Sequence, residues 1–161
     1  MYCAIDFGTS NSGIAVPAPN AAGGAVQLLE LEPGRPTMPT AVFYAVEGLA
    51  WHEEPRRLYG SAAIAAYVEG TEGRLMRSMK SILGSTLVER RTDLGGGHSV
   101  AYLDVVAGYL RQLKQQAEAH VGAPIAQAVL GRPVFFVDDD AERDAKAQAA
   151  LEAAARSVGF A

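Results

Sequence analysis

Near its start the chain carries the stretch Ile5-Asp6-Phe7-Gly8-Thr9-Ser10-Asn11-Ser12-Gly13, which lies between two short apolar segments, residues 2–6 and 13–17. Apolar runs of this length, rich in small and branched residues and separated by Gly, Ser and Thr, are typical of a strand, a turn and a second strand. Glycine at positions 8 and 13 permits the positive φ angles and the close backbone approach of a tight turn. The stretch therefore predicts a β-hairpin whose turn spans Asp6–Gly13.

This turn has the composition of a phosphate-binding site. Successive backbone N–H groups can point into one concavity that accepts anionic oxygens, and Thr9 and Ser10 add hydroxyl donors. At the end of the first strand, Asp6 can hold a hydrated Mg²⁺ against those phosphates. On the residues alone, a plain glycine-rich hairpin with a surface aspartate remains the alternative.

Two widespread phosphate loops do not fit the same residues. Gly8 and Gly13 have the glycine spacing of a P-loop, but Ile14-Ala15 follows where Lys and Ser/Thr are required. A dinucleotide-binding fingerprint leads into a helix, whereas Ile14-Ala15-Val16-Pro17 is typical of a strand.

The rest of the chain alternates strands and helices, which predicts an α/β fold with a mixed sheet. Patterning places strands at residues 25–31, 40–46 and 126–130, and a hairpin or loop at 85–99. We expect helices at residues 59–67 (with Ser61 as its cap), 74–83, 101–120 and 140–158, the last of these capped by Asp140. A loop is expected at Gly131-Arg132-Pro133.

Composition excludes several classes of function. The 161 residues carry a formal net charge of −4, which does not favour binding to nucleic acid. No apolar run is long enough to cross a membrane, and the N-terminus lacks the pattern of a secretory signal, so a cytoplasmic location is expected. The single cysteine, Cys3, has apolar neighbours and is expected to be a buried, unreactive residue.

The turn resembles the first phosphate motif of the actin, sugar-kinase and heat-shock ATPase superfamily, and most of all that of the seventy-kilodalton heat-shock chaperones. Met79-Lys80-Ser81-Ile82-Leu83-Gly84 resembles the segment that carries the family's catalytic lysine. The helix and strand of residues 110–134 resemble the family's next core elements, and Arg143 lies near the start of the following helix. Arg74–Lys80 and Gly131–Val134 look particularly like a divergent bacterial, YegD-like branch of the family.

The resemblance implies a ribonuclease H-like, actin-like ATPase lobe with a mixed sheet flanked by helices. Its core would comprise residues 1–36 and 101–161, and residues 37–100 would form a small inserted subdomain. Asp6, Gly8, Thr9, Ser10 and Asn11 would face the phosphates of ATP, Asp6 would bind Mg²⁺, and Lys80 with Asp6 would be catalytic. The implied function is ATP hydrolysis by water in a chaperone, with clients and co-chaperones bound through other regions. A strand is expected after residue 161, so we expect the chain to be truncated before the second lobe and to be inactive alone.

Some features depart from the family pattern or imitate it. Asn11 replaces an aromatic residue of the main chaperone branch, and residues between Pro133 and Arg143 are additional, so an equivalent role for Arg143 stays open. The segment Asp93–Gly97 imitates the family's second phosphate motif, but no buried strand precedes it, so we expect a hairpin turn there. Two other functions remain alternatives: a sugar- or acetate-kinase-like phosphotransferase, and a non-catalytic actin-like scaffold.

Overall fold

The computed structural model of the chain describes residues 1–19, 24–131, 136–137 and 139–161. The larger sheet within this range contains β1 (Tyr2–Phe7), β2 (Asn11–Pro17), β3 (Val26–Leu28), β4 (Thr37–Pro39) and β10 (Gln127–Gly131). Its strand order is β10-β1-β2-β3, and β4 pairs with the first half of β2. Since β10 is parallel to β1 and the other pairs are antiparallel, the sheet is mixed, as predicted.

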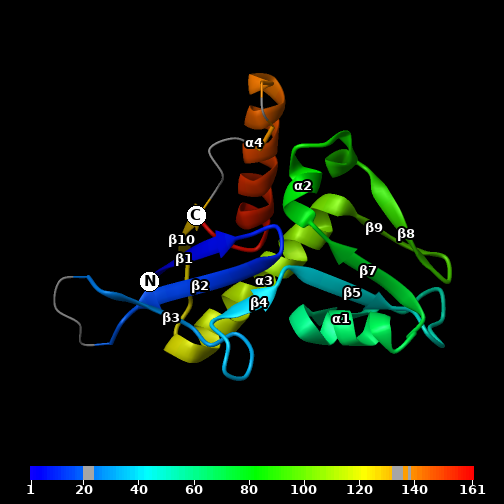
Figure 1. The fold of residues 1–161 in the computed structure, drawn as a ribbon, viewed down its shortest axis with the longest axis horizontal. Coiled ribbons are helices and arrows are strands. Elements are labelled where there is room, and N and C mark those ends of the chain that lie inside the picture. Colours follow the sequence, from blue (N-terminus) through cyan, green and yellow to red (C-terminus); the bar gives the residue numbers. More distant parts are fainter. Residues whose placement is uncertain (20–23, 132–135, 138) are drawn as a thin grey trace.

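Helix α3 (Tyr102–Val121) packs on the larger sheet, and α4 (Ala141–Ser157) packs against α3 and extends beyond the sheet (Figure 1). In β1 the side chains alternate, so that Cys3, Ile5 and Phe7 are buried while Tyr2 and Asp6 are exposed. The buried set packs with α3 and α4 in one large hydrophobic cluster. Asp6 therefore lies on the face of the sheet opposite the main core.

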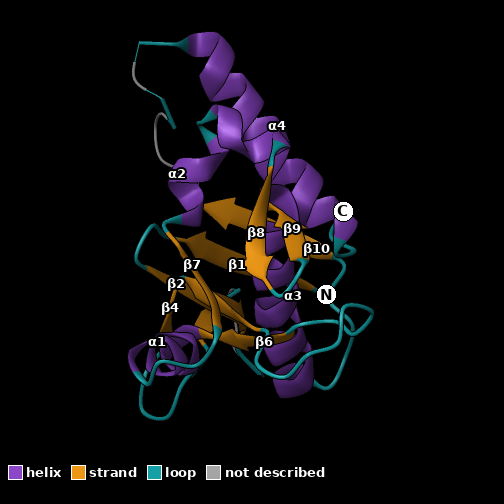
Figure 2. Ribbon diagram, turned by 90° about the vertical axis from the view of Figure 1, so that its right-hand side faces the viewer, coloured by secondary structure: helices purple, strands orange, loops and turns teal. Residues whose placement is uncertain are grey.

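A second sheet has the strand order β6-β5-β7, formed by β5 (Ala41–Ala45), β6 (Arg56–Tyr59) and β7 (Gly73–Arg77). Helix α1 (Gly60–Val68) packs on it through Ala63 and Ala66, which contact Phe43 in a small cluster of their own. After β7 come α2 (Met79–Leu83), a 3-10 turn η1 (Thr86–Glu89) and the hairpin β8 (Arg91–Gly95) and β9 (His98–Ala101). Figure 2 shows this hairpin beside α3.

Most of the predicted elements are confirmed, with boundaries shifted by a few residues. The helices around residues 101–120 and 140–158 end at glycines with positive φ, Gly122 and Gly159, near the predicted positions. Asp140 caps α4 by accepting a hydrogen bond from the N–H of Arg143, as expected. Cys3 is fully buried, and the Asp93–Gly97 segment forms the turn of the β8–β9 hairpin. The predicted loop at residues 131–133 falls, apart from Gly131, outside the described residues.

Two predictions about the helices are wrong. Residues 74–83 do not form one helix: Gly73–Arg77 is strand β7, and only Met79–Leu83 is helical. Pairing with β5 fixes the first half as a strand, and Ser78 turns the chain with a φ of 53°. Ser61 does not cap α1, since Tyr59 occupies the cap position and Ser61 is the second helical residue.

In the described residues, no helix is both long enough and apolar enough to span a membrane.

Candidate functional site

The turn between β1 and β2 is the centre of the candidate site, and Gly8 makes it possible. A Cβ at position 8 would lie 2.0 Å from the backbone oxygen of Asn11, so only glycine allows this backbone approach. Gly13 is different: a Cβ there would meet Pro36 and Thr37 at ordinary contact distances of 3.7 and 3.8 Å. Neither glycine has a positive φ, so that part of the prediction is wrong. Close approach, at Gly8 alone, is the reason for glycine in this turn.

The carboxylate of Asp6 stands in open space at the end of β1. Its cross-strand partners are both glycines, Gly13 in β2 and Gly131 in β10, which have no side chains to cover it. Among the described residues, no hydrogen bond or ion pair to this carboxylate is found, and the residue is exposed. Asp6 is therefore free to bind a ligand.

The tip of the turn also offers unused hydrogen-bond donors. Thr9, Ser10 and Asn11 are all exposed. Within the described part of the chain, the backbone N–H groups of Thr9 and Ser10 donate to no other group. Free N–H groups at the tip of a turn are the feature that binds anionic oxygens.

Beneath the tip, a buried polar network anchors the turn. Ser12 Oγ and Thr40 Oγ1 are 2.8 Å apart, and the N–H of Thr40 donates to the oxygen of Ser10 at 2.9 Å. From α3, the hydroxyl of Tyr109 donates to the oxygen of Pro39 at 3.0 Å. Burial raises the pKa of Tyr109 to about 12, which keeps this donor protonated. The sequence gives no signal for this network, because its members are separated by up to 97 positions and carry no local pattern.

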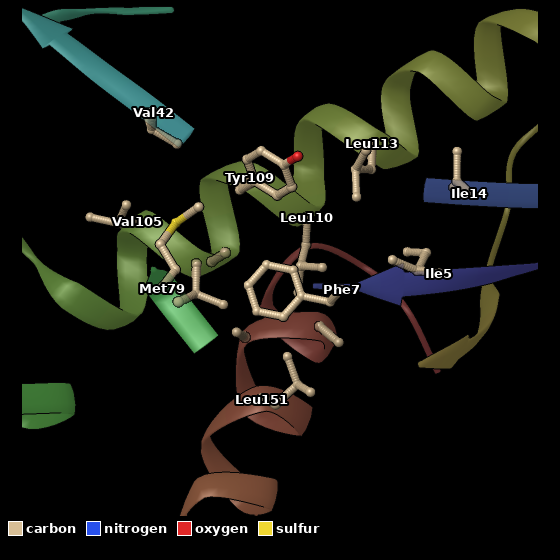
Figure 3. Close-up of a cluster of buried hydrophobic side chains, with 14 of the residues drawn as sticks. Ile5, Phe7, Ile14, Val42, Met79, Val105, Tyr109, Leu110, Leu113 and Leu151 are labelled. Atoms are coloured by element: carbon tan, nitrogen blue, oxygen red, sulfur yellow. The ribbon is translucent and has the colours of Figure 1, made fainter. Parts of the chain in front are cut away.

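Lys80 lies on α2, which begins at Met79. Phe7, which follows Asp6, and Met79, which precedes Lys80, are both fully buried in the main hydrophobic cluster (Figure 3). Lys80 is half-buried, and no hydrogen bond or ion pair to its ammonium is found among the described residues. At the end of the same helix, Arg143 donates from Nη2 to the oxygen of Gly84 at 2.8 Å, tying α2 to α4.

The Asp93–Gly97 segment does not join this site. It forms a hairpin turn in which Asp93 accepts a hydrogen bond from the N–H of Gly95 at 2.9 Å. Gly95 packs near Val46, which follows β5. In Figures 1 and 2 this hairpin and the β1–β2 turn lie apart in both views.

The residues present fit a magnesium ion shared with a phosphate ligand. Among the described residues no three His, Cys, Asp or Glu side chains gather into a cluster that could hold a metal alone. Mg²⁺ keeps several waters and is usually held by one or two carboxylates together with substrate phosphates. A single open carboxylate beside free N–H donors satisfies that requirement.

A comparison with family models matches residues 2–155 to the family described as Hsp70 protein. The chain belongs to the Hsp70 family. The mixed sheet with its flanking helices is the actin-like ATPase fold of that family, as the sequence predicted. The Hsp70 match supports a domain of the chaperone ATPase type, and it covers both the β1–β2 turn and Lys80.

Proposed function

We propose that the Asp6–Gly13 turn holds the phosphates of Mg-ATP and that the protein hydrolyses ATP by attack of water, as one lobe of a heat-shock-type chaperone. The observation that carries the proposal is the open Asp6 carboxylate between two glycines, next to free N–H groups of the same turn. Membership of the Hsp70 family supports ATP as the nucleotide.

Each residue has a task that follows from its position. Asp6 would hold the hydrated cation, and the N–H and hydroxyl groups of Thr9 and Ser10 would donate to phosphate oxygens. Bound Mg²⁺ would neutralise part of the negative charge of the phosphates. Asn11 would orient the nucleotide at the edge of the turn, and the ammonium of Lys80 would offset charge that develops on the γ-phosphate.

The wider organisation is part of the same proposal. Residues 1–36 and 101–161 would form the ribonuclease H-like core of the lobe, and residues 37–100 the inserted subdomain. ATP would lie in a cleft completed by a second lobe, in a cytoplasmic protein of the YegD-like branch whose clients and co-chaperones bind elsewhere.

The test is steady-state phosphate release from ATP by the full-length protein. We expect Asp6→Asn and Lys80→Met each to lower kcat about 100-fold, the usual effect of removing one group that stabilises charge in the transition state. Asp93→Asn and Lys146→Met are the matched controls, because Asp93 lies in the other Asp-Gly segment and Lys146 is an exposed lysine on α4.

Wild-type rates for both site variants would overturn the proposal and favour a non-catalytic scaffold. Phosphate transfer to a sugar or to acetate, in place of release into water, would favour the kinase alternative. If the Asp93 variant lost activity while the Asp6 variant stayed active, the phosphate site would belong to the Asp93–Gly97 segment instead of the Asp6–Gly13 turn.

A further inference from the structure

A polar cavity of about 600 Å³ lies on the far side of α3 from the phosphate turn. Its floor is Ala107 and Gly108, where the lack of large side chains leaves space, and Asp104 and Arg111 flank that floor on the same helix face. The opposite face of α3 carries Tyr109, which contacts Phe7 and the turn. The cavity is therefore distinct from the proposed nucleotide site.

Arginine side chains from separate elements line this cavity. Arg57 comes from β6, Arg91 from β8 and Arg111 from α3, so three elements converge on it. Arg91 donates to Ser99 through Nε at 3.0 Å and Nη2 at 2.8 Å, which fixes the plane of its guanidinium. No ion pair to Arg91 or Arg111 is found within the described residues.

Carboxylates also line the cavity, but among the described residues none of them pairs with Arg91 or Arg111. Glu54 pairs with Arg57 at 3.5 Å and is 87% exposed, so this contact is weak and easily opened. Glu53 accepts a hydrogen bond from the N–H of Ala50 at 2.8 Å and so stabilises its own loop. Asp104 lies two turns before Arg111, about 10 Å along the helix.

Two further polar side chains, His98 and Tyr44, complete the lining. His98 has a ring nitrogen, Nε2, that is buried and has no hydrogen-bond partner. Burial raises the pKa of Tyr44 to about 12, so its hydroxyl stays protonated. A buried polar atom without a partner is costly, and a ligand that bonds to it removes that cost.

We propose that this cavity binds a small organic anion through a carboxylate or phosphate group placed between Arg91 and Arg111. The paired geometry of guanidinium with such oxygens favours arginine over lysine at a site of this kind. His98 would meet a polar group of the same ligand. The carboxylates at the rim repel long polyanions, and so the site selects a small ligand over nucleic acid.

Trp51 gives a direct readout, because it is the only tryptophan in the chain and lies at the cavity. We would titrate the protein with inorganic phosphate and, separately, with succinate, at constant ionic strength, and follow tryptophan emission. We expect a saturable change with at least one probe and a Kd on the order of 1 mM, within the affinity that so few atoms allow. Saturation by succinate alone would identify a carboxylate site, and by phosphate alone a phosphate site.

Arg111→Gln is expected to weaken that binding about tenfold, because the substitution removes one charge-assisted hydrogen bond to the ligand. Arg74→Gln is the matched control, since Arg74 is an exposed arginine outside the cavity. A thermal-shift titration on the same proteins detects binding even if the emission of Trp51 does not change, because a ligand that binds the folded state raises Tm. No saturable response to either probe in both assays, or equal binding by Arg111→Gln and wild type, would overturn the proposal.

Discussion

At the scale of single residues, Gly8 and Gly13 belong to the same sequence motif, but only Gly8 is required for close backbone approach. We predict that Gly8→Ala destabilises the protein by about 1–3 kcal/mol, because the new methyl group meets backbone at Asn11 and cannot be accommodated by a side-chain rotation. Urea unfolding followed by circular dichroism measures the change. Gly13→Ala is the control: its added methyl group makes only ordinary contacts, so stability should be unchanged or slightly higher. Equal destabilisation by the two substitutions would contradict this reading of the turn.

Residue types and spacing were sufficient to predict where Asp6, Thr9, Ser10 and Asn11 lie, because a hairpin turn is a local structure. What the sequence could not provide is the support beneath it. The hydrogen bond of Tyr109 to Pro39 and the Ser12–Thr40 contact join positions far apart in the chain, and a single sequence gives no signal for such pairs. The placement of Gly131 beside Asp6 depends likewise on the parallel pairing of β10 with β1.

At the scale of elements, the error at residues 74–83 has a clear physical cause. Leu75, Met79, Ile82 and Leu83 have helical spacing, but Leu75 belongs to a strand that is held between hydrogen-bonding partners. Tertiary pairing outweighs a local preference worth only a fraction of a kcal/mol per residue. The break at Ser78, in a left-handed conformation, directs Met79 into the core and leaves Lys80 half-buried beside it.

Helix α1 depends on a cap supplied from outside the helix. Glu32 accepts hydrogen bonds from the N–H of Ser61 at 2.6 Å and from its hydroxyl at 2.7 Å, and it places negative charge at the helix N-terminus. We predict that Glu32→Ala lowers the free energy of unfolding by about 0.5–2 kcal/mol, as loss of a cap does. Chemical denaturation compares it with Glu47→Ala, which removes an exposed carboxylate and should have little effect. A wild-type midpoint for Glu32→Ala would mean that α1 is held by its packing on β5 alone.

At the scale of the whole molecule, one hydrophobic cluster links the two sheets. It joins Ile5 and Ile14 of the larger sheet to Val42 of the smaller one, through Leu110 of α3 (Figure 3). Met76 of β7 and Val106 of α3 belong to the same cluster. The C-terminal residue is tied to the larger sheet, since the N–H of Ala161 donates to the oxygen of Ala126, which precedes Gln127, the partner of Tyr2 in β1. Loss of packing in either sheet should therefore destabilise the other sheet as well, and we expect the described region to unfold cooperatively.

Buried acidic groups of this cluster make the fold sensitive to alkaline pH. Burial raises the pKa of Cys3 to about 11 and the pKa values of Tyr44 and Tyr109 to about 12, above their ordinary values of 9.0 and 10.0. Each group is thus harder to deprotonate in the folded chain than in the unfolded chain. The stability that they contribute is fully present below about pH 9 and is lost as the pH rises towards the folded pKa values.

We therefore predict that the urea midpoint falls steadily between about pH 9 and pH 11, the window between unfolded and folded titration. Tyr109→Phe should make the fall shallower, because it removes one of the titrating groups, although it also lowers stability at neutral pH by about 1–2 kcal/mol through loss of the hydrogen bond to Pro39. Tyr67→Phe is the control, since Tyr67 is 60% exposed and lies outside the main hydrophobic cluster. A midpoint that stays constant up to pH 11 would mean that these hydroxyl and thiol groups reach solvent without unfolding, and that the core beneath the phosphate turn opens locally.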